Sequence, residues 1–248
     1  MSLLRAGIQR TNNLNGQLEK KHSSRNQIAT IIAIVLHVVG LAGILLVDSD
    51  FIIRCTSYNL LICFGLLIWT QRDKNKAFLL FTVLVCILGF IVEIVGVNTG
   101  LVFGKYSYGA ILGPKLFGVP FIIGINWFIV IYCSGIATQT LLMTIVGKNI
   151  PSTGPPKMIK VMALVVDGAT IATFFDWLME PSVTRLEFWH WLGDGSIPVY
   201  NYICWFVTSM VFLTIFKLCK FRKHNKFAIN LLLIQIVFFL ILRIYLDN

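Results

Sequence analysis

Seven apolar blocks of about 20 residues run through this chain and constrain its fold more than any other feature. They cover residues 28–47, 51–70, 77–97, 119–147, 159–179, 199–218 and 226–245. A helix rises about 1.5 Å per residue, so about 20 apolar residues cross the roughly 30 Å hydrocarbon core of a bilayer. Charged residues make up 13% of the chain, against about 25% in soluble domains. The sequence therefore predicts an all-α integral membrane protein, a single bundle of about seven transmembrane helices spanning residues 27–248.

Basic residues are distributed unevenly between the two sides of this bundle. One side, made of residues 1–26 and every second loop, holds 16 of the 21 Lys and Arg residues. Cytoplasmic segments are enriched in Lys and Arg, so the N-terminus is predicted in the cytoplasm and the C-terminus outside. Residues 1–26 are then a polar, basic cytoplasmic tail and not a cleaved signal. We expect a multi-pass protein of the bacterial cytoplasmic membrane, with the net charge of +10 explained without a nucleic-acid partner.

Acidic residues are rare in the spans and lie toward the outer side. Glu93, Asp167 and Asp176 fall inside predicted spans, and Glu180 lies at the lip of the fifth. A charged group at the bilayer centre costs at least ~2.5 kcal/mol, so such residues usually have a function or a buried partner. Asp176 and Glu180 are four residues apart and share a helix face, whereas Asp167 is about half a turn out of phase with Asp176. These four are the candidate catalytic residues.

Two interpretations of these acids remain open. Burial and a neighbouring negative charge both favour the protonated form of a carboxylic acid, which can serve as a general acid. Alternatively, Glu93 or Asp167 is a hydrogen-bonding group in helix packing, or forms an ion pair with Arg185 or Lys105.

The two predicted outer loops, residues 98–118 and 180–198, are rich in aromatic residues. One interpretation is the belt of Trp and Tyr found at membrane interfaces. The other is a lining for a flat apolar substrate, or for a carbocation held by cation–π attraction. His190 would shuttle protons or be structural, and Asn201 would orient a water molecule or cap a helix. The candidate substrate-binding residues are Tyr106, Tyr108, Trp127, Trp177, Trp189, His190, Asn201 and Tyr202.

Absent motifs narrow the possible chemistry. The sequence has no HxxxH or HxxHH box, as di-iron membrane hydroxylases require, and no CxxC pair. The seventh span has no Lys near its middle for a retinal Schiff base, and no G-x-G-x-x-G or P-loop offers a nucleotide site. Asp176 and Glu180 form a single acidic motif, whereas Mg²⁺-dependent prenyltransferases have two. We therefore expect a reaction that needs acid, water and an apolar substrate, with no metal and no cofactor.

Two blocks of this sequence resemble the CruF-type carotenoid biosynthesis family of membrane hydratases. The first is EIVGVNTGLVFGKYSYGAILGPKLFGVP from Glu93 to Pro120, followed by the Asn126–Trp127 pair. The second runs from Asp167 to Trp205 and reads D…FFDWLMEP…FWHWLGDGSIPVYNYICW. Glycines usual before the second proline and before the last tryptophan are replaced here, by Ser196–Ile197 and by Cys204.

The resemblance implies a cofactor-independent hydro-lyase that adds water across the terminal C1–C2 double bond of an acyclic carotenoid end group, giving a tertiary alcohol. Its substrate would be an acyclic or monocyclic carotenoid. Membrane lipids and other carotenoid-pathway enzymes are the expected neighbours. On this hypothesis Glu93 and Asp176 form the acid/base pair, in either order, and Glu180 tunes them. The main alternative is a non-catalytic carrier or transporter of an isoprenoid or lipid, and a third possibility is an Mg²⁺-dependent prenyltransferase.

Overall fold

Among the residues that the structure describes, seven helices are long and apolar enough to cross a membrane, which confirms the predicted all-α membrane bundle. The structure is a computed structural model that describes residues 2–47, 50–149 and 157–247, with side chains described for 20–47, 50–145 and 158–246. The spans are Lys20–Val47, Asp50–Thr70, Lys76–Thr99, Ile122–Ile145, Met158–Arg185, Val199–Leu218 and Lys226–Leu246.

The chain alternates long helices with short connections. Its elements in order are α1 (Ser2–Ala42), a π-helical turn η1 (Gly43–Val47), α2 (Asp50–Arg54), α3 (Thr56–Thr70), α4 (Lys76–Thr99), β1 (Tyr106–Tyr108), β2 (Lys115–Leu116), β3 (Val119–Pro120), α5 (Ile122–Asn149), α6 (Lys157–Arg185), β4 (Trp189–Trp191), α7 (Val199–Leu218) and α8 (Lys226–Asp247).

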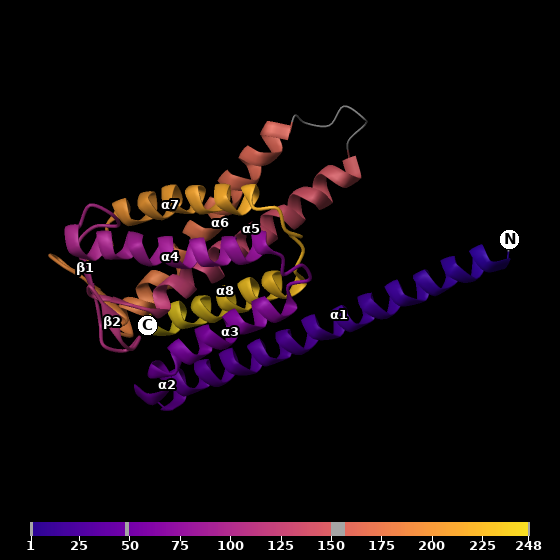
Figure 1. Cartoon of the computed structure of the whole chain (residues 1–248). Helices are drawn as coiled ribbons and strands as arrows, with labels where there is room; N and C mark the ends of the chain where they lie inside the picture. Colours follow the sequence, from indigo (N-terminus) through magenta and orange to yellow (C-terminus); the bar gives the residue numbers. More distant parts are fainter. Residues whose placement is uncertain (1, 48–49, 150–156, 248) are drawn as a thin grey trace.

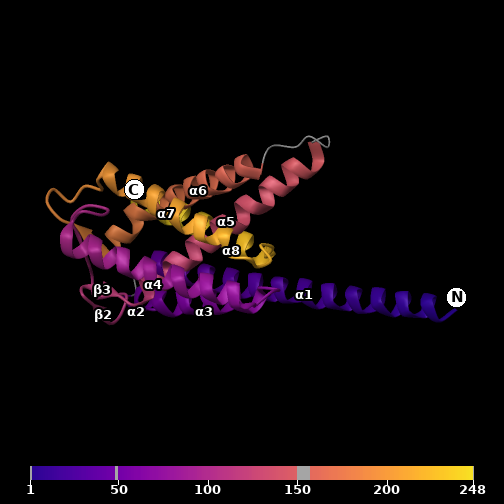
Figure 2. The same ribbon diagram turned by 45° about the horizontal axis from the view of Figure 1, so that its top comes forward.

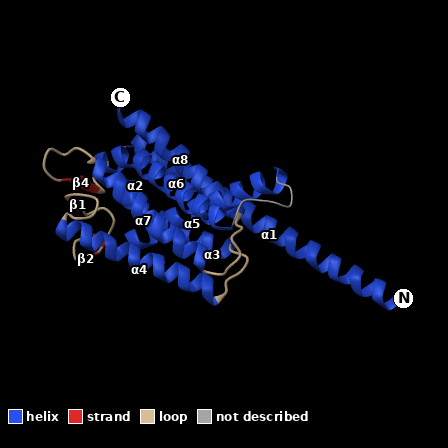
Figure 3. Ribbon diagram, turned by 90° about the horizontal axis from the view of Figure 1, so that it is seen from above, coloured by secondary structure: helices blue, strands red, loops and turns tan. Residues whose placement is uncertain are grey.

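The two ends of the bundle differ in structure (Figure 1). All four strands lie at one end, which we call the strand face, and the C-terminus lies there too. The N-terminus lies at the opposite end, where α1 extends beyond the other helices (Figure 3). Figure 2 shows the bundle from another side, with α3 running along α1. Termini at opposite ends agree with an odd number of spans.

Helix α5 is the centre of the bundle. It contacts α3, α4, α6, α7 and α8, and residues 127–136 are buried without interruption. A helix that is apolar on every side packs in an interior, as here. Close packing against α4 depends on small residues: a Cβ on Gly124 would lie 2.4 Å from the Cys86 carbonyl oxygen, and one on Gly89 would lie 2.6 Å from Trp127 Cβ. These contacts hold Trp127 against α4.

A buried network of polar side chains connects the loops 71–75 and 219–225 to the helices at the end opposite the strand face. Asn225 Nδ2 donates to Thr70 Oγ1 at 3.0 Å and to the Tyr132 hydroxyl at 3.1 Å. Tyr132 in turn donates to Gln71 Oε1 at 2.7 Å, and Gln71 Nε2 donates to the Arg222 carbonyl at 2.9 Å. The partners come from four segments, so the network ties α3, α5 and both loops together.

Helix α6 is longer than predicted, because it continues through Pro181 to Arg185. Proline has no N–H, so the carbonyl four residues earlier, on Trp177, loses its helical donor. Arg243 Nη1 donates to that carbonyl at 2.9 Å, and its guanidinium carbon lies 4.1 Å from the Trp177 ring centroid. This replacement donor from α8 lets α6 continue. The prediction that the span ends at 179, with Glu180 at its lip, was wrong: Glu180 is inside the helix.

Candidate active site

A two-stranded antiparallel pair brings the two aromatic loops together. Strand β1 pairs with β4 in the register Tyr106↔Trp191, Ser107↔His190 and Tyr108↔Trp189. Side chains alternate across a strand, so the two Tyr and the two Trp share one face, and Ser107 and His190 share the other. Gly109 continues the pairing through its N–H to the Phe188 carbonyl, 2.9 Å away. A Cβ there would lie 2.0 Å from the Glu187 carbonyl oxygen, so only glycine fits.

Glu93 of α4 lies under this pair and accepts three hydrogen bonds. Its Oε2 accepts from the hydroxyls of Tyr106 at 2.5 Å and Tyr108 at 2.8 Å. Its Oε1 accepts from Trp127 Nε1 at 2.8 Å. An ionised carboxylate is an acceptor only, and three donors match that form. Glu93 therefore acts in this site as a hydrogen-bond acceptor. Its side chain is buried, with 4% of its surface exposed.

The two tyrosines stay protonated in this arrangement. Burial raises the pKa of the Tyr106 hydroxyl well above its usual range, and the Glu93 charge raises it further. Burial and Glu93 act in the same direction on the pKa of Tyr108. A phenol with a raised pKa keeps its proton at neutral and alkaline pH. Both residues therefore remain hydrogen-bond donors to Glu93 throughout the physiological range.

Asp176 and Glu180 face the same cavity from successive turns of α6, as their spacing predicts. Asp176 Oδ2 accepts from Asn201 Nδ2 at 2.8 Å, while its Oδ1 is buried with no hydrogen-bond partner among the described residues. Glu180 Oε2 accepts from Trp189 Nε1 at 2.9 Å. In the described part of the chain, the recorded donors to these two carboxyl groups and to Glu93 are all neutral side chains.

Stacked aromatic rings form the wall between the acids and the bundle core. Trp127 of α5 and Trp205 of α7 stack with ring centroids 4.1 Å apart and an interplanar angle of 20°. Phe103 packs on both, with centroids at 6.1 and 6.3 Å. Phe103 has a left-handed backbone conformation with φ of 66°, which is uncommon outside glycine. This conformation is found where the chain turns from α4 into the site.

The three acids and these rings enclose a cavity of about 30 Å³. A polar cavity of this volume holds a water molecule. Two buried polar atoms on residues that line it, Asp176 Oδ1 and Trp191 Nε1, lack a hydrogen-bond partner among the described residues. The cavity can therefore place a water molecule or a reacting atom next to a carboxyl oxygen.

Several sequence-predicted residues line this cavity, and others do not. Those that line it are Glu93, Tyr106, Tyr108, Trp127, Asp176, Glu180, Trp189 and Asn201. Asp167 is exposed on the outside of α6, which follows from its half-turn offset from Asp176. Trp177, one residue after Asp176, is also turned outward and is 43% exposed. His190 is exposed on the other side of β4, and Tyr202 is half-buried beside the cavity without lining it.

Some lining residues had not been assigned to the site from the sequence. Phe103, Asn126, Met179, Trp191 and Trp205 also line the cavity, although the sequence predicts no individual site role for them. The i, i+2 spacing of Trp189 and Trp191 and the i, i+4 spacing of Asn201 and Trp205 were signals that could have found two of them. Phe103 left no such signal, because its position depends on a left-handed turn.

Among the residues that the structure describes, there is no group of three or more His, Cys, Asp or Glu side chains positioned to hold a metal ion. The fold and the site together define a multi-pass membrane protein with a buried carboxyl cluster, roofed by aromatic side chains, at one end of its bundle.

Comparison with known proteins gives the family. The chain belongs to the family described as carotenoid biosynthesis protein, whose profile matches residues 51–247. It is also similar to bisanhydrobacterioruberin hydratase of Haloarcula japonica, with 27% identity over 128 residues. That match covers 50% of this chain and 40% of the relative, so it spans well under half of the relative's length. No solved structure matches the chain.

Proposed function

We propose that this protein is a carotenoid hydratase, which adds water to the terminal C1–C2 double bond of an acyclic end group. The observation that carries the proposal is the contrast between two carboxyl groups at one cavity. Glu93 is held by three donors, whereas Asp176 has one oxygen without a partner among the described residues. Family membership and the hydratase similarity support a carotenoid as the substrate.

Asp176 is the proton donor in this proposal. Asp176 lines the cavity and its Oδ1 has no partner among the described residues, so a proton on Oδ1 is available for transfer, while Asn201 Nδ2 donates to Oδ2. Transfer of that proton to C2 of the substrate breaks the double bond and leaves a tertiary cation at C1. Positioned general acids of this kind contribute about 10²–10⁴-fold to a rate.

Glu93 stabilises the cation in this proposal. Its negative charge, held by Tyr106, Tyr108 and Trp127, lies beneath the aromatic rings that face the cavity. A fixed charge oriented before the reaction stabilises developing charge without reorganisation, and the ring faces add cation–π attraction. Glu93 is then an electrostatic group and not half of the acid/base pair, which departs from the sequence-based hypothesis.

Glu180 completes the reaction as the base. The oxygen of a water molecule in the cavity bonds to C1, and one proton of that water passes to Glu180. The product is a tertiary alcohol, and Asp176 is left ionised. The proton on Glu180 returns to Asp176 one helical turn away, because two neighbouring buried carboxylates share a proton more readily than both ionise. Atoms and charge then balance over one turnover.

Co-expression in a bacterial host that accumulates an acyclic carotenoid tests the proposal. The pigment should gain the mass of one water per hydrated end, measured by mass spectrometry of the extract. The Asp176→Asn variant should lose about 10²–10⁴-fold of this activity. Asp194 lies on an exposed loop, where its side chain accepts from Ser196, so Asp194→Asn is the matched control and should match the wild type. Unchanged pigment at good expression would contradict the proposed hydratase activity and favour the non-catalytic carrier.

A further inference from the structure

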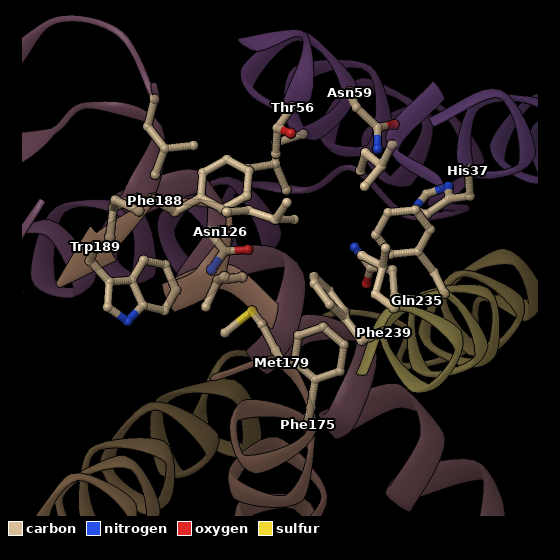
Figure 4. Close-up of a pocket in the computed structure, with 18 residues that line it drawn as sticks. His37, Thr56, Asn59, Asn126, Phe175, Met179, Phe188, Trp189, Gln235 and Phe239 are labelled. Atoms are coloured by element: carbon tan, nitrogen blue, oxygen red, sulfur yellow. The ribbon is translucent and has the colours of Figure 1, made fainter. Parts of the chain in front are cut away.

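A second cavity, of about 90 Å³, lies beside the one lined by the three acids (Figure 4). We call the second cavity the inner cavity and the one lined by the acids the acidic cavity. Its walls come from α1, α3, α5, α6 and α8 and from the chain around β4, and most of its lining is apolar. It shares Ile123, Asn126, Met179 and Trp189 with the acidic cavity. In the described part of the chain, these four residues alone line both spaces. The inner cavity therefore ends where the carboxyl groups begin.

Trp189 and Asn126 mark this junction. Trp189 lines the inner cavity while its Nε1 donates to Glu180 on the acidic side, and Figure 4 shows its indole nitrogen directed away from the centre of the pocket. Asn126 lines both cavities and has no recorded hydrogen bond within the described residues. Its amide is therefore available to hold a water molecule at the junction.

His37 of α1 lines the inner cavity on the side away from Trp189 (Figure 4), and Phe238 of α8 lines the cavity too. His37 and Phe238 meet edge to face, with ring centroids 5.4 Å apart at 87°. The same two residues line a hollow of about 300 Å³ whose other lining is entirely aliphatic, from Ile34 to Leu41 on α1 and from Leu233 to Ile241 on α8. These stretches lie near the middle of the first and seventh spans. The hollow therefore opens sideways to the acyl chains of a bilayer.

We propose that a carotenoid enters from the bilayer between α1 and α8, past His37 and Phe238, and that the polyene next to its reacting end occupies the inner cavity. This rests on the proposed function, since it places the reacting end at Asp176. Gln235 is 6% exposed and has no recorded hydrogen bond among the described residues. Its amide N–H groups can contact the π face of a polyene, which a saturated lipid tail lacks. Helix α1, which closes one side, lies outside the matched residues 51–247.

Substitutions that fill the inner cavity test this route. Thr56 on α3 and Val183 on α6 line the cavity from different helices, so Thr56→Phe and Val183→Phe each reduce its volume. Thr170 and Val166 are exposed on the outside of α6, and Thr170→Phe and Val166→Phe are the matched controls. Two filling variants on separate helices cover the case in which one of them does not fold.

Lycopene retained by purified protein in lipid nanodiscs is the readout, measured in an Asp176→Asn background so that binding is separated from turnover. We expect each filling variant that folds to lose lycopene by about tenfold or more, with both controls unchanged. Equal retention in all variants, with hydration intact in the wild type, would overturn the route while leaving the proposed function standing. Retention that depends on the cavity without any hydration would support the route and overturn the hydratase. A wild type that neither binds nor hydrates lycopene would overturn both.

Discussion

The hydroxyl of Tyr106 donates a hydrogen bond of 2.5 Å to Oε2 of Glu93, which joins strand β1 to helix α4. Tyr106 lies in the connection between two spans and Glu93 lies inside a span. The bond therefore attaches the aromatic strand pair β1–β4 to a buried carboxyl group. Through the pairing of Tyr106 with Trp191, the same bond connects α4 to the segment that follows α6. The bond therefore lies between the helix that carries Glu93 and the strand pair over the cavity.

Removing the Tyr106 hydroxyl should slow hydration without unfolding the protein. Hydrogen bonds to a charged group contribute about 1.5–3 kcal/mol, so Tyr106→Phe should lower kcat/KM by about 10- to 100-fold. Initial rates of hydration in isolated membranes measure this. Tyr245 is exposed and donates only to the Leu45 carbonyl, and Tyr245→Phe should stay within about twofold of the wild type. Equal rates in both variants would contradict the role of Glu93.

Asp167 should be dispensable for the reaction, although it lies in the same helix as Asp176 and Glu180. Its side chain is exposed on the outside of α6 and does not line the cavity. Asp167→Asn should hydrate at the wild-type rate, compared with Asp176→Asn at equal expression in the same membranes. A large loss of activity in Asp167→Asn would mean that the acids of α6 act from a different face.

Packing between α4 and α5 should be sensitive to a single methyl group. A Cβ on Gly124 would lie 2.4 Å from the Cys86 carbonyl oxygen, and backbone atoms cannot move aside cheaply. Gly124→Ala should lower the free energy of unfolding by about 1–3 kcal/mol, measured by denaturant titration in detergent micelles. Gly65 of α3 has nothing within 4 Å of the added Cβ. Gly65→Ala is the control and should be at least as stable as the wild type.

The polar network opposite the strand face should contribute to stability and not to chemistry. Tyr132→Phe leaves Gln71 Oε1 without its donor, and a buried acceptor left unpaired costs about 1–3 kcal/mol. Thermal unfolding should shift to lower temperature while the rate of hydration of the folded protein is unchanged. Tyr58→Phe, at a residue 68% exposed on α3, should leave the free energy of unfolding within about 0.5 kcal/mol of the wild type and the rate of hydration unchanged. A selective loss of rate in Tyr132→Phe would place this network in the reaction.

Hydropathy alone predicted the seven spans, because a bilayer requires about 20 consecutive apolar residues of every helix that crosses it. Residue spacing within one helix was equally readable: it predicted a shared face for Asp176 and Glu180 and an offset for Asp167. Spacing also carried information about Trp177, which follows Asp176 by about 100° around the helix and is turned outward, although the sequence reading placed it in the pocket.

Contacts between segments far apart in the chain were decided by the tertiary structure. Which side of β4 faces the acids depends on its register with β1, so His190 and Trp189 could not be separated in advance. The Trp177 carbonyl that Pro181 leaves without a helical donor accepts instead from Arg243, a residue of another helix. A sequence records the periodicity of each helix, but the partner of a buried polar atom is set by packing in three dimensions. Thus the sequence determined the membrane bundle and its acidic residues, and the fold decided which of those acids share a cavity.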